Sequence, residues 1–224
     1  MKRTILFFAS LAVVLLTQAQ TSREFIKQNI SDNNECESVA ITKNNGNAMI
    51  YGRNGWATQG CPFNFTDALR VLNEENHQIQ DIHLTEQGRW IILFENNGME
   101  WNNIYDELLL KMKQYNNQAE HITTVTCNDQ GDWILVTTKR ITASSDELLE
   151  WLGEGMDIYG ALWTACITDD AAVAVFEHGF RFYGNVPADL IEALRACSHD
   201  VYTIKIAGND WFFRCTDGYW KYSM

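Results

Sequence analysis

Cysteine and histidine are the residues of this chain best suited to covalent chemistry, because a thiolate is a strong nucleophile and an imidazole is its usual base. The six cysteines are Cys36, Cys61, Cys127, Cys166, Cys197 and Cys215. A thiol enzyme needs one of them beside a histidine and an acidic group. Only His83 and His178 fall in strand-like segments, and neither lies in a recognisable motif. A cysteine nucleophile working with His83 or His178 is therefore kept as the alternative hypothesis.

Metal and cofactor chemistry has no support in the sequence. The five histidines are isolated from one another at ligand spacing, and neither CxxC nor HxxxH occurs. The sequence also lacks an EF-hand loop and a glycine-rich phosphate loop. Acidic residues such as Asp129, Asp132 and Asp210 fall at predicted turns, where aspartate is favoured for backbone reasons. We expect no metal site, no cofactor and no catalytic residue set.

Aromatic side chains offer a second kind of chemistry, since exposed rings can stack on sugars or anchor a protein partner. Trp90, Trp133 and Trp211 recur at one place in a repeat, which indicates packing. Five other aromatic residues break the repeat and are the candidate binding residues: Trp56, Trp101, Tyr183, Trp220 and Tyr222. The alternative is that each short strand buries these rings against a helix layer.

A recurring phrase reveals the elements that position these residues. Residues 88–93 (GRWIIL) recur as residues 131–136 (GDWILV), with weaker copies before and after. A segment of alternating apolar residues precedes each copy, and a turn and a short third segment follow it, which predicts three strands. A helix then begins near residues 104, 144 and 186, with Ser145 or Asn185 as an N-cap and acidic residues in the first turn.

The repeat divides the chain after residue 19 into five α-β-β-β units: 20–60, 61–103, 104–143, 144–185 and 186–224. One such unit cannot bury its own apolar face, so the units must pack on each other. An open α/β solenoid would need polar caps, and neither terminal unit is notably more polar than the middle ones. The sequence therefore favours an α+β repeat protein closed as a pseudo-five-fold α/β propeller. In unit count and element content this resembles the pentein class, although the resemblance covers no catalytic motif.

The repeat also makes a prediction about two of the cysteines. Alignment of the first strands places Cys127 and Cys166 in one column with Leu84 and Ile206. Such a column is apolar, so both thiols are expected to fill the core. The sequence leaves the pairing of the six cysteines in disulfides open.

The N-terminus predicts export. Lys2 and Arg3 precede an apolar stretch at residues 5–16, and Ala19 supplies the small residue before a cleavage site, so residues 1–19 are expected to be a signal peptide. The stretch is too short to span a bilayer comfortably, so we expect a secreted or periplasmic protein with no membrane span after cleavage. The net charge of −12 repels phosphate backbones and argues against a nucleic-acid partner.

The function expected from these features is an exported, non-enzymatic binding or interaction module for an unknown protein or carbohydrate. The alternative is a pentein-like thiol hydrolase or transferase with a cysteine nucleophile. A purely structural surface or envelope component is a third possibility that the sequence does not separate from the first.

Overall fold

The computed structural model describes residues 22–43 and 46–223, so the predicted signal peptide, residues 1–19, lies outside the described residues. The described chain forms five successive units, each a helix followed by a three-stranded antiparallel sheet. This confirms the α-β-β-β repeat. Within the described part of the chain, no helix is both long and apolar enough to cross a membrane.

Helices and strands alternate regularly along the chain. The helices are α1 (Ser22–Asn33), α2 (Phe63–Glu74), α3 (Asp106–Asn117), α4 (Asp146–Tyr159) and α5 (Ala188–Arg195). The strands are β1 (Ser38–Ile41), β2 (Asn47–Tyr51), β3 (Gly55–Gln59), β4 (Ile79–Leu84), β5 (Trp90–Phe94), β6 (Gly98–Asn102), β7 (Ile122–Cys127), β8 (Trp133–Thr137), β9 (Ile141–Ala143), β10 (Leu162–Ile167), β11 (Ala171–Phe176), β12 (Gly179–Gly184), β13 (Val201–Ala207), β14 (Asp210–Cys215) and β15 (Trp220–Tyr222). Each sheet joins three consecutive strands in chain order.

The helix starts follow the predicted capping rules at α4 but not at α5. Ser145 caps α4, since its side chain accepts a hydrogen bond from the Leu148 main-chain N–H. The prediction of Asn185 as the cap of α5 is wrong, because Pro187 occupies that position and makes no side-chain cap. Its backbone, with φ −56°, already suits entry into a helix, so α5 begins without a capping hydroxyl or amide.

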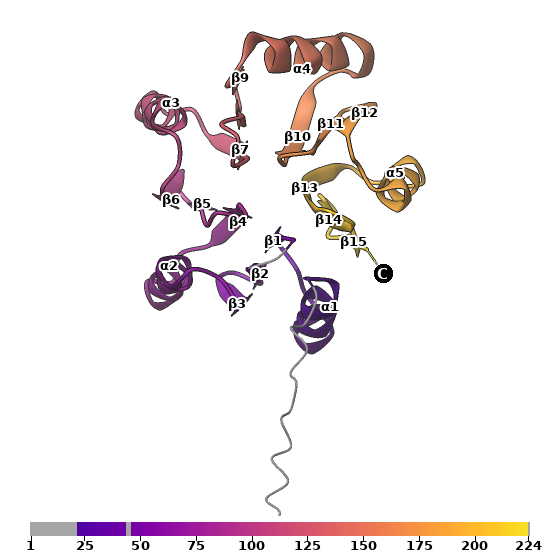
Figure 1. Cartoon of the computed structure of the whole chain (residues 1–224). Coiled ribbons are helices and arrows are strands. Elements are labelled where there is room, and N and C mark those ends of the chain that lie inside the picture. Colours follow the sequence, from indigo (N-terminus) through magenta and orange to yellow (C-terminus); the bar gives the residue numbers. More distant parts are fainter. Residues whose placement is uncertain (1–21, 44–45, 224) are drawn as a thin grey trace, which may run out of the picture.

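The first strands of the five units lie around a common centre, with the helices on the outside (Figure 1). β1 contacts both β4 and β13, while β10 contacts both β7 and β13. The five sheets stay separate, because in the described residues strands pair only within a unit. We call β1, β4, β7, β10 and β13 the inner strands.

Each helix packs between its own sheet and the sheet of the unit before it. In the α2 cluster, Phe65 and Ile82 of the second unit meet Ala48 and Ile50 of the first. The clusters around α3, α4 and α5 repeat this arrangement.

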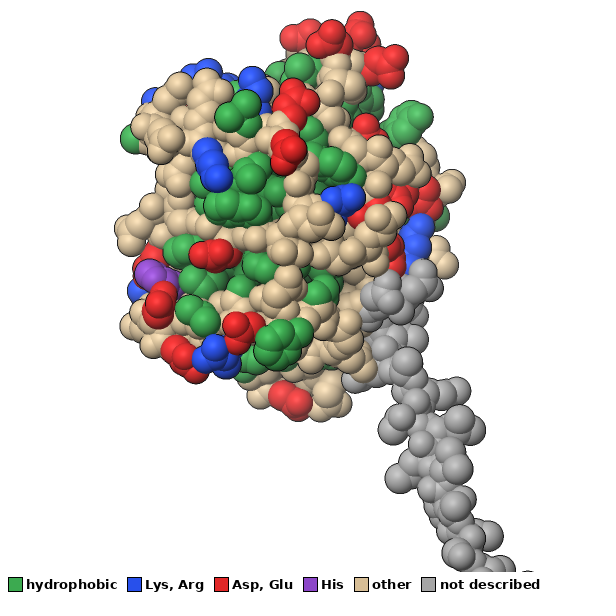
Figure 2. Space-filling model, turned by 60° about the vertical axis from the view of Figure 1, so that its left-hand side comes forward, with side chains coloured by type: hydrophobic (Ala, Val, Ile, Leu, Met, Phe, Trp, Pro, Cys, Tyr) green, Lys and Arg blue, Asp and Glu red, His purple; other side chains and the backbone are tan. Residues whose placement is uncertain are grey.

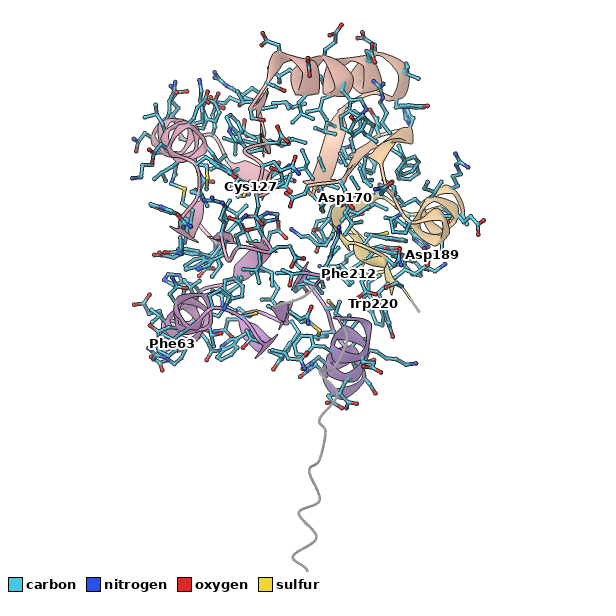
Figure 3. All side chains as sticks on the ribbon, viewed as in Figure 1. Phe63, Cys127, Asp170, Asp189, Phe212 and Trp220 are labelled. Atoms are coloured by element: carbon cyan, nitrogen blue, oxygen red, sulfur yellow. The ribbon has the colours of Figure 1, made fainter. Side chains whose placement is uncertain are left out.

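The first unit follows the same rule, with the last unit as its neighbour. The cluster around α1 contains Phe25 and Ile26 together with Ala207 and Phe212. Figure 3 shows Phe212 and Trp220 on the last sheet, on the side toward α1.

The repeated tryptophans are buried, as the sequence predicts. Trp90, Trp133 and Trp211 are 4%, 2% and 3% exposed and belong to the apolar clusters of their units. On the outer surface, acidic side chains are spread between patches of hydrophobic ones (Figure 2). The scattered charge agrees with a solvated surface rather than a single charged patch.

Candidate binding site

Four of the five inner strands carry a β-bulge near their start. Counting from the bulge gives equivalent positions in the four strands. The irregularity falls between Ile79 and Asp81 in β4, and at equivalent places in β7, β10 and β13. The residues that then share one position are His83, Thr126, Cys166 and Lys205.

The predicted column that joined Cys127 and Cys166 is therefore wrong by one residue. Cys127 lies opposite Trp133, whereas in β10 it is Ile167 that lies opposite Ala172, and Cys166 pairs with Val173. Five residues separate Cys127 from its partner Trp133, but only four separate Ile167 from its partner Ala172, so an alignment without gaps shifts β10 by one residue. Both thiols are nevertheless buried, as the sequence predicts.

Side chains at the aligned position bridge neighbouring units. The His83 Nε2 atom lies 2.7 Å from the Cys127 carbonyl oxygen and 3.1 Å from the Cys127 nitrogen. Thr126 Oγ1 accepts a hydrogen bond of 3.1 Å from the Ile167 N–H. Inner strands of different units share no ladder, so these side chains supply partners that buried main-chain groups require.

A buried ion pair lies among the inner strands. Lys205 Nζ donates to Asp81 Oδ2 at 2.9 Å, and the two side chains are 7% and 13% exposed. The other carboxylate oxygen, Asp81 Oδ1, accepts a hydrogen bond of 2.5 Å from Ser38 Oγ. The carboxylate is thus compensated on both oxygens, which buried charges require.

A pocket of about 270 Å³ lies where the five inner strands end, and we call it the central pocket. Every unit contributes to its wall, through residues 40–43, 83–86, 127–129, 166–169 and 205–207. Lys43 of the first unit reaches Asp170 of the fourth, with Nζ 2.9 Å from Oδ2. This bond lowers the pKa of Asp170 and keeps its carboxylate ionised.

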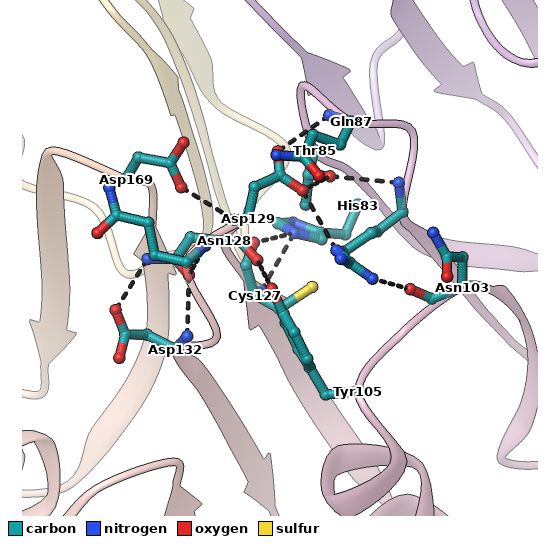
Figure 4. Close-up of polar contacts among 12 residues, drawn as sticks. His83, Thr85, Gln87, Asn103, Tyr105, Cys127, Asn128, Asp129, Asp132 and Asp169 are labelled. Atoms are coloured by element: carbon teal, nitrogen blue, oxygen red, sulfur yellow. Dashed lines mark hydrogen bonds and ion pairs between the residues drawn. The ribbon is translucent and has the colours of Figure 1, made fainter.

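The turns around the central pocket are tied together by carboxylates (Figure 4). Asp129 accepts hydrogen bonds from Thr85 Oγ1 at 2.6 Å and from the Gln87 N–H at 2.9 Å, both in the preceding unit. Its own N–H donates to Asp169 Oδ1 at 2.9 Å in the following unit. These aspartates hold the turns of neighbouring units together. The sequence explains aspartate at turns by local backbone preference alone, so this role between units is an addition from the structure.

The pKa values of the buried thiols and of the imidazole in the central pocket disfavour a thiolate–imidazolium pair. Burial raises the pKa of Cys127 to about 12 and also raises the pKa of Cys166. Burial, helped by the Lys205 charge, lowers the pKa of His83 to about 4. A thiol nucleophile instead depends on a lowered pKa. The His83 ring bonds to the main chain of Cys127, and His178 is exposed beside Glu177.

Four of the five predicted binding aromatics pack on helices. Trp56 of β3 joins the α2 cluster, and Trp101 of β6 joins the α3 cluster. Trp220 and Tyr222 of β15 stack with ring centroids 5.9 Å apart and join the α1 cluster. Each ring is half-buried against the helix of a neighbouring unit, so apart from Trp220 and Tyr222 the structure does not bring these residues together.

Tyr183, the fifth candidate, is 69% exposed at the end of β12. It lines a second pocket, of about 660 Å³, which we call the side pocket. This pocket adjoins the central pocket, since Asn128 and residues 167–169 line both.

The side pocket combines aromatic rings with acidic and amide groups. Its other polar and aromatic lining residues are Gln130, Asp132, Ser145, Glu147, Trp151, Asp169 and Asp170. Trp151 of α4 is fixed by Arg181, whose Nη1 donates to the Trp151 carbonyl oxygen at 2.6 Å and whose guanidinium lies 5.6 Å from the ring centroid.

Sequence reasoning missed Trp151. Its position in the sequence was unusual, because Trp151 is a tryptophan inside a predicted helix and is surrounded by acidic residues. A helical tryptophan is more simply explained as core, and Trp151 is indeed half-buried against the apolar cluster around α4. Only the fold shows that it also lines the pocket of Tyr183.

Comparison of the chain with known protein families and with curated proteins finds no match to either. The candidate site therefore rests on the geometry of the chain itself.

Proposed function

We propose that the five units close into a pseudo-five-fold α/β propeller, and that this propeller is an exported, non-enzymatic module that binds neutral carbohydrate in the side pocket. Closure is supported by the α1 cluster, which joins the first unit to Ala207 and Phe212 of the last. It is also supported by the contact of β1 with β13. An open solenoid would leave the apolar faces of both terminal units uncovered.

The observation that supports carbohydrate binding is the position of Tyr183 and Trp151 on one pocket whose remaining polar groups are carboxylates, amides and hydroxyls. A sugar ring presents an apolar C–H face and an edge of hydroxyl groups. Aromatic rings cover the first, and carboxylate or amide oxygens accept hydrogen bonds from the second. Apolar walls with a few oriented polar groups are typical of small-ligand sites.

The charge of the side pocket defines which carbohydrate it suits. Asp132, Glu147, Asp169 and Asp170 line the pocket, and Lys43 is paired with one of them. Sialylated, sulfated or phosphorylated glycans would bring like charge against these carboxylates. The pocket therefore favours uncharged sugars.

The thiol-hydrolase alternative has weaker support. It needs a cysteine with a lowered pKa beside a basic imidazole. In the central pocket, burial moves the pKa of Cys127 upward and the pKa of His83 downward, which opposes both requirements.

An array of neutral and acidic oligosaccharides, followed by calorimetric titration of the neutral ligands bound, tests the proposed function. We expect binding to neutral glycans that falls at least tenfold in Tyr183→Ala and is retained in Tyr183→Phe, since the phenyl ring preserves stacking. Phe63→Ala is the matched control, because Phe63 is an exposed aromatic residue that does not line the side pocket.

Two outcomes would count against carbohydrate binding in the side pocket. One is an array with no neutral glycan bound by the folded protein. The other is a bound glycan whose affinity is the same in wild type and in Tyr183→Ala.

A further inference from the structure

Two cysteines of the last unit lie in contact. Cys197 follows α5 and Cys215 ends β14, and their Sγ atoms are 3.8 Å apart. Both are free thiols in this structure, as are the other four cysteines, all of which fall within the described residues. Within that part of the chain, no second pair of cysteine sulfurs makes such a contact. Cys36 and Cys61 instead approach main-chain carbonyl oxygens.

We propose that Cys197 and Cys215 are joined by a disulfide in the mature, exported protein. A disulfide requires the sulfur atoms to approach to about 2.05 Å. Cys197 lies in the irregular segment between α5 and β13 and is half-buried, so its side chain can turn toward Cys215 without disturbing a helix or strand. Cys215 is 0% exposed and stays fixed in the sheet.

The difference in exposure sets the order of the reaction. The oxidant is a protein that carries an exchangeable disulfide, as oxidising compartments contain. The Cys197 thiolate attacks one sulfur of that disulfide, forms a mixed disulfide and releases the first oxidant thiolate, which takes up a proton. Cys215 then loses its proton and attacks Cys197 Sγ, which releases the second oxidant thiol. The two cysteines lose two electrons and two protons, and the oxidant gains them.

Burial of Cys215 makes it the second reactant. Burial and the adjacent Cys197 sulfur raise the pKa of Cys215, so it is a poor first nucleophile. Contact with Cys197 places it correctly for the second step. The remaining thiols have no such partner, and burial raises the pKa of Cys36, Cys61, Cys127 and Cys166 as well.

The cross-link would act on the unit that meets α1. It would tie the segment after α5 to the end of β14 and enclose β13 in the loop. Disulfides stabilise mainly by restricting the unfolded chain. Here the restriction would apply to the unit that supplies Ala207 and Phe212 to the α1 cluster.

The test uses the full chain, produced by export into an oxidising compartment and unfolded without reductant in the presence of an alkylating agent. We expect four of the six cysteines to be alkylated. Before alkylation, we also expect the intact mass of the exported protein to lie about 2 Da below the mass of the same protein after reduction, since a disulfide lacks two hydrogens. Peptide mapping should identify one cross-linked species, which joins the peptides of Cys197 and Cys215.

Two variants provide the comparison. In Cys197→Ser all remaining cysteines should be alkylated, and reductant should no longer shift the thermal midpoint that it lowers in wild type. Cys61→Ser, another half-buried thiol, should keep both the cross-link and the effect of reductant. Alkylation of all six cysteines in the exported wild type would overturn the proposal, and so would a cross-link between any other pair. The result does not depend on glycan binding.

Discussion

Lys205 and Asp81 form a buried ion pair between inner strands that are not neighbours. The Lys205 Nζ atom of β13 lies 2.9 Å from Asp81 Oδ2 of β4. β1 contacts both strands and lies between them (Figure 1). The pair therefore links the second and fifth units, which in the described residues share neither an apolar cluster nor a sheet ladder.

Removal of one partner of this pair should strongly destabilise the fold. Lys205→Met leaves the Asp81 carboxylate buried without its cation, and such changes cost about 3–5 kcal/mol. The double variant Asp81→Asn/Lys205→Met should lose less, because no charge remains buried. Chemical denaturation measures both.

Lys43→Met is the matched control for the ion pair. Lys43 and Asp170 form a bond of the same length, but both side chains are 37% exposed, so its loss should cost under about 1 kcal/mol. A loss in Lys205→Met no larger than that in Lys43→Met would contradict the prediction.

His83 should make the stability of the protein depend on pH. Its pKa is about 4 in the folded chain and 6.5 in the unfolded chain. Between these values the unfolded state binds the extra proton, so stability is complete above about pH 6.5 and falls as the pH drops toward 4. The shift corresponds to about 3 kcal/mol, at 1.36 kcal/mol per pKa unit.

Denaturation of wild type and His83→Gln across this pH range isolates the histidine, because the carboxylates are the same in both proteins. Glutamine can hydrogen bond to the Cys127 main chain but does not titrate. The free-energy difference between the two proteins should therefore change by about 3 kcal/mol over this range. A constant difference would show that the buried imidazole is not responsible.

Trp133→Ala should behave as a core truncation. Trp133 is 2% exposed in the α3 cluster, and removal of such a ring costs about 3–5 kcal/mol. Trp101→Ala on the third strand of the preceding unit should cost less, because that ring is only half-buried. A loss below about 1 kcal/mol in Trp133→Ala would mean that the repeated tryptophan is not core.

Ring closure should be visible as energetic coupling between the first and last units. Ile26 of α1 and Phe212 of β14 belong to one buried cluster, so their alanine variants should couple by about 0.5–3 kcal/mol in a double-mutant cycle. Leu69→Ala in α2 combined with Phe212→Ala is the control, since Leu69 lies in a different cluster, and these two effects should add. Additive effects for Ile26 and Phe212 would indicate an open arrangement in solution.

Local elements were predictable because they depend on short-range pattern. β4 and β7 lie ahead of the recurring phrase, where the alternation of apolar residues predicts a strand, and Ser145 caps α4. Register was less predictable. The shorter separation of paired residues across the turn after β10 moves Cys166 out of the Cys127 column, and this separation is not encoded in strand periodicity.

The surroundings of the candidate binding residues were only partly predictable for a related reason. Trp56, Trp101, Trp220 and Tyr222 differ from the residues at matching places in other units, so they look like exceptions in the sequence. In the structure each packs against the apolar cluster around the helix of a neighbouring unit. Tyr183 differs because its side chain remains exposed, although it lines the side pocket together with residues of α4.

The sequence by itself determined the repeat, the order of its elements and the burial of its recurring tryptophans, because periodicity and turn chemistry act over a few residues. The tertiary structure alone decided that Lys205 meets Asp81, that Cys197 meets Cys215 and that Tyr183 shares a pocket with Trp151. The first contact joins two units, so its distance depends on how the units pack around the common centre. The other two lie within one unit each, and they bring a helix, or the segment after it, against a strand at least 18 residues further along the chain. No local pattern in the chain specifies either kind of contact.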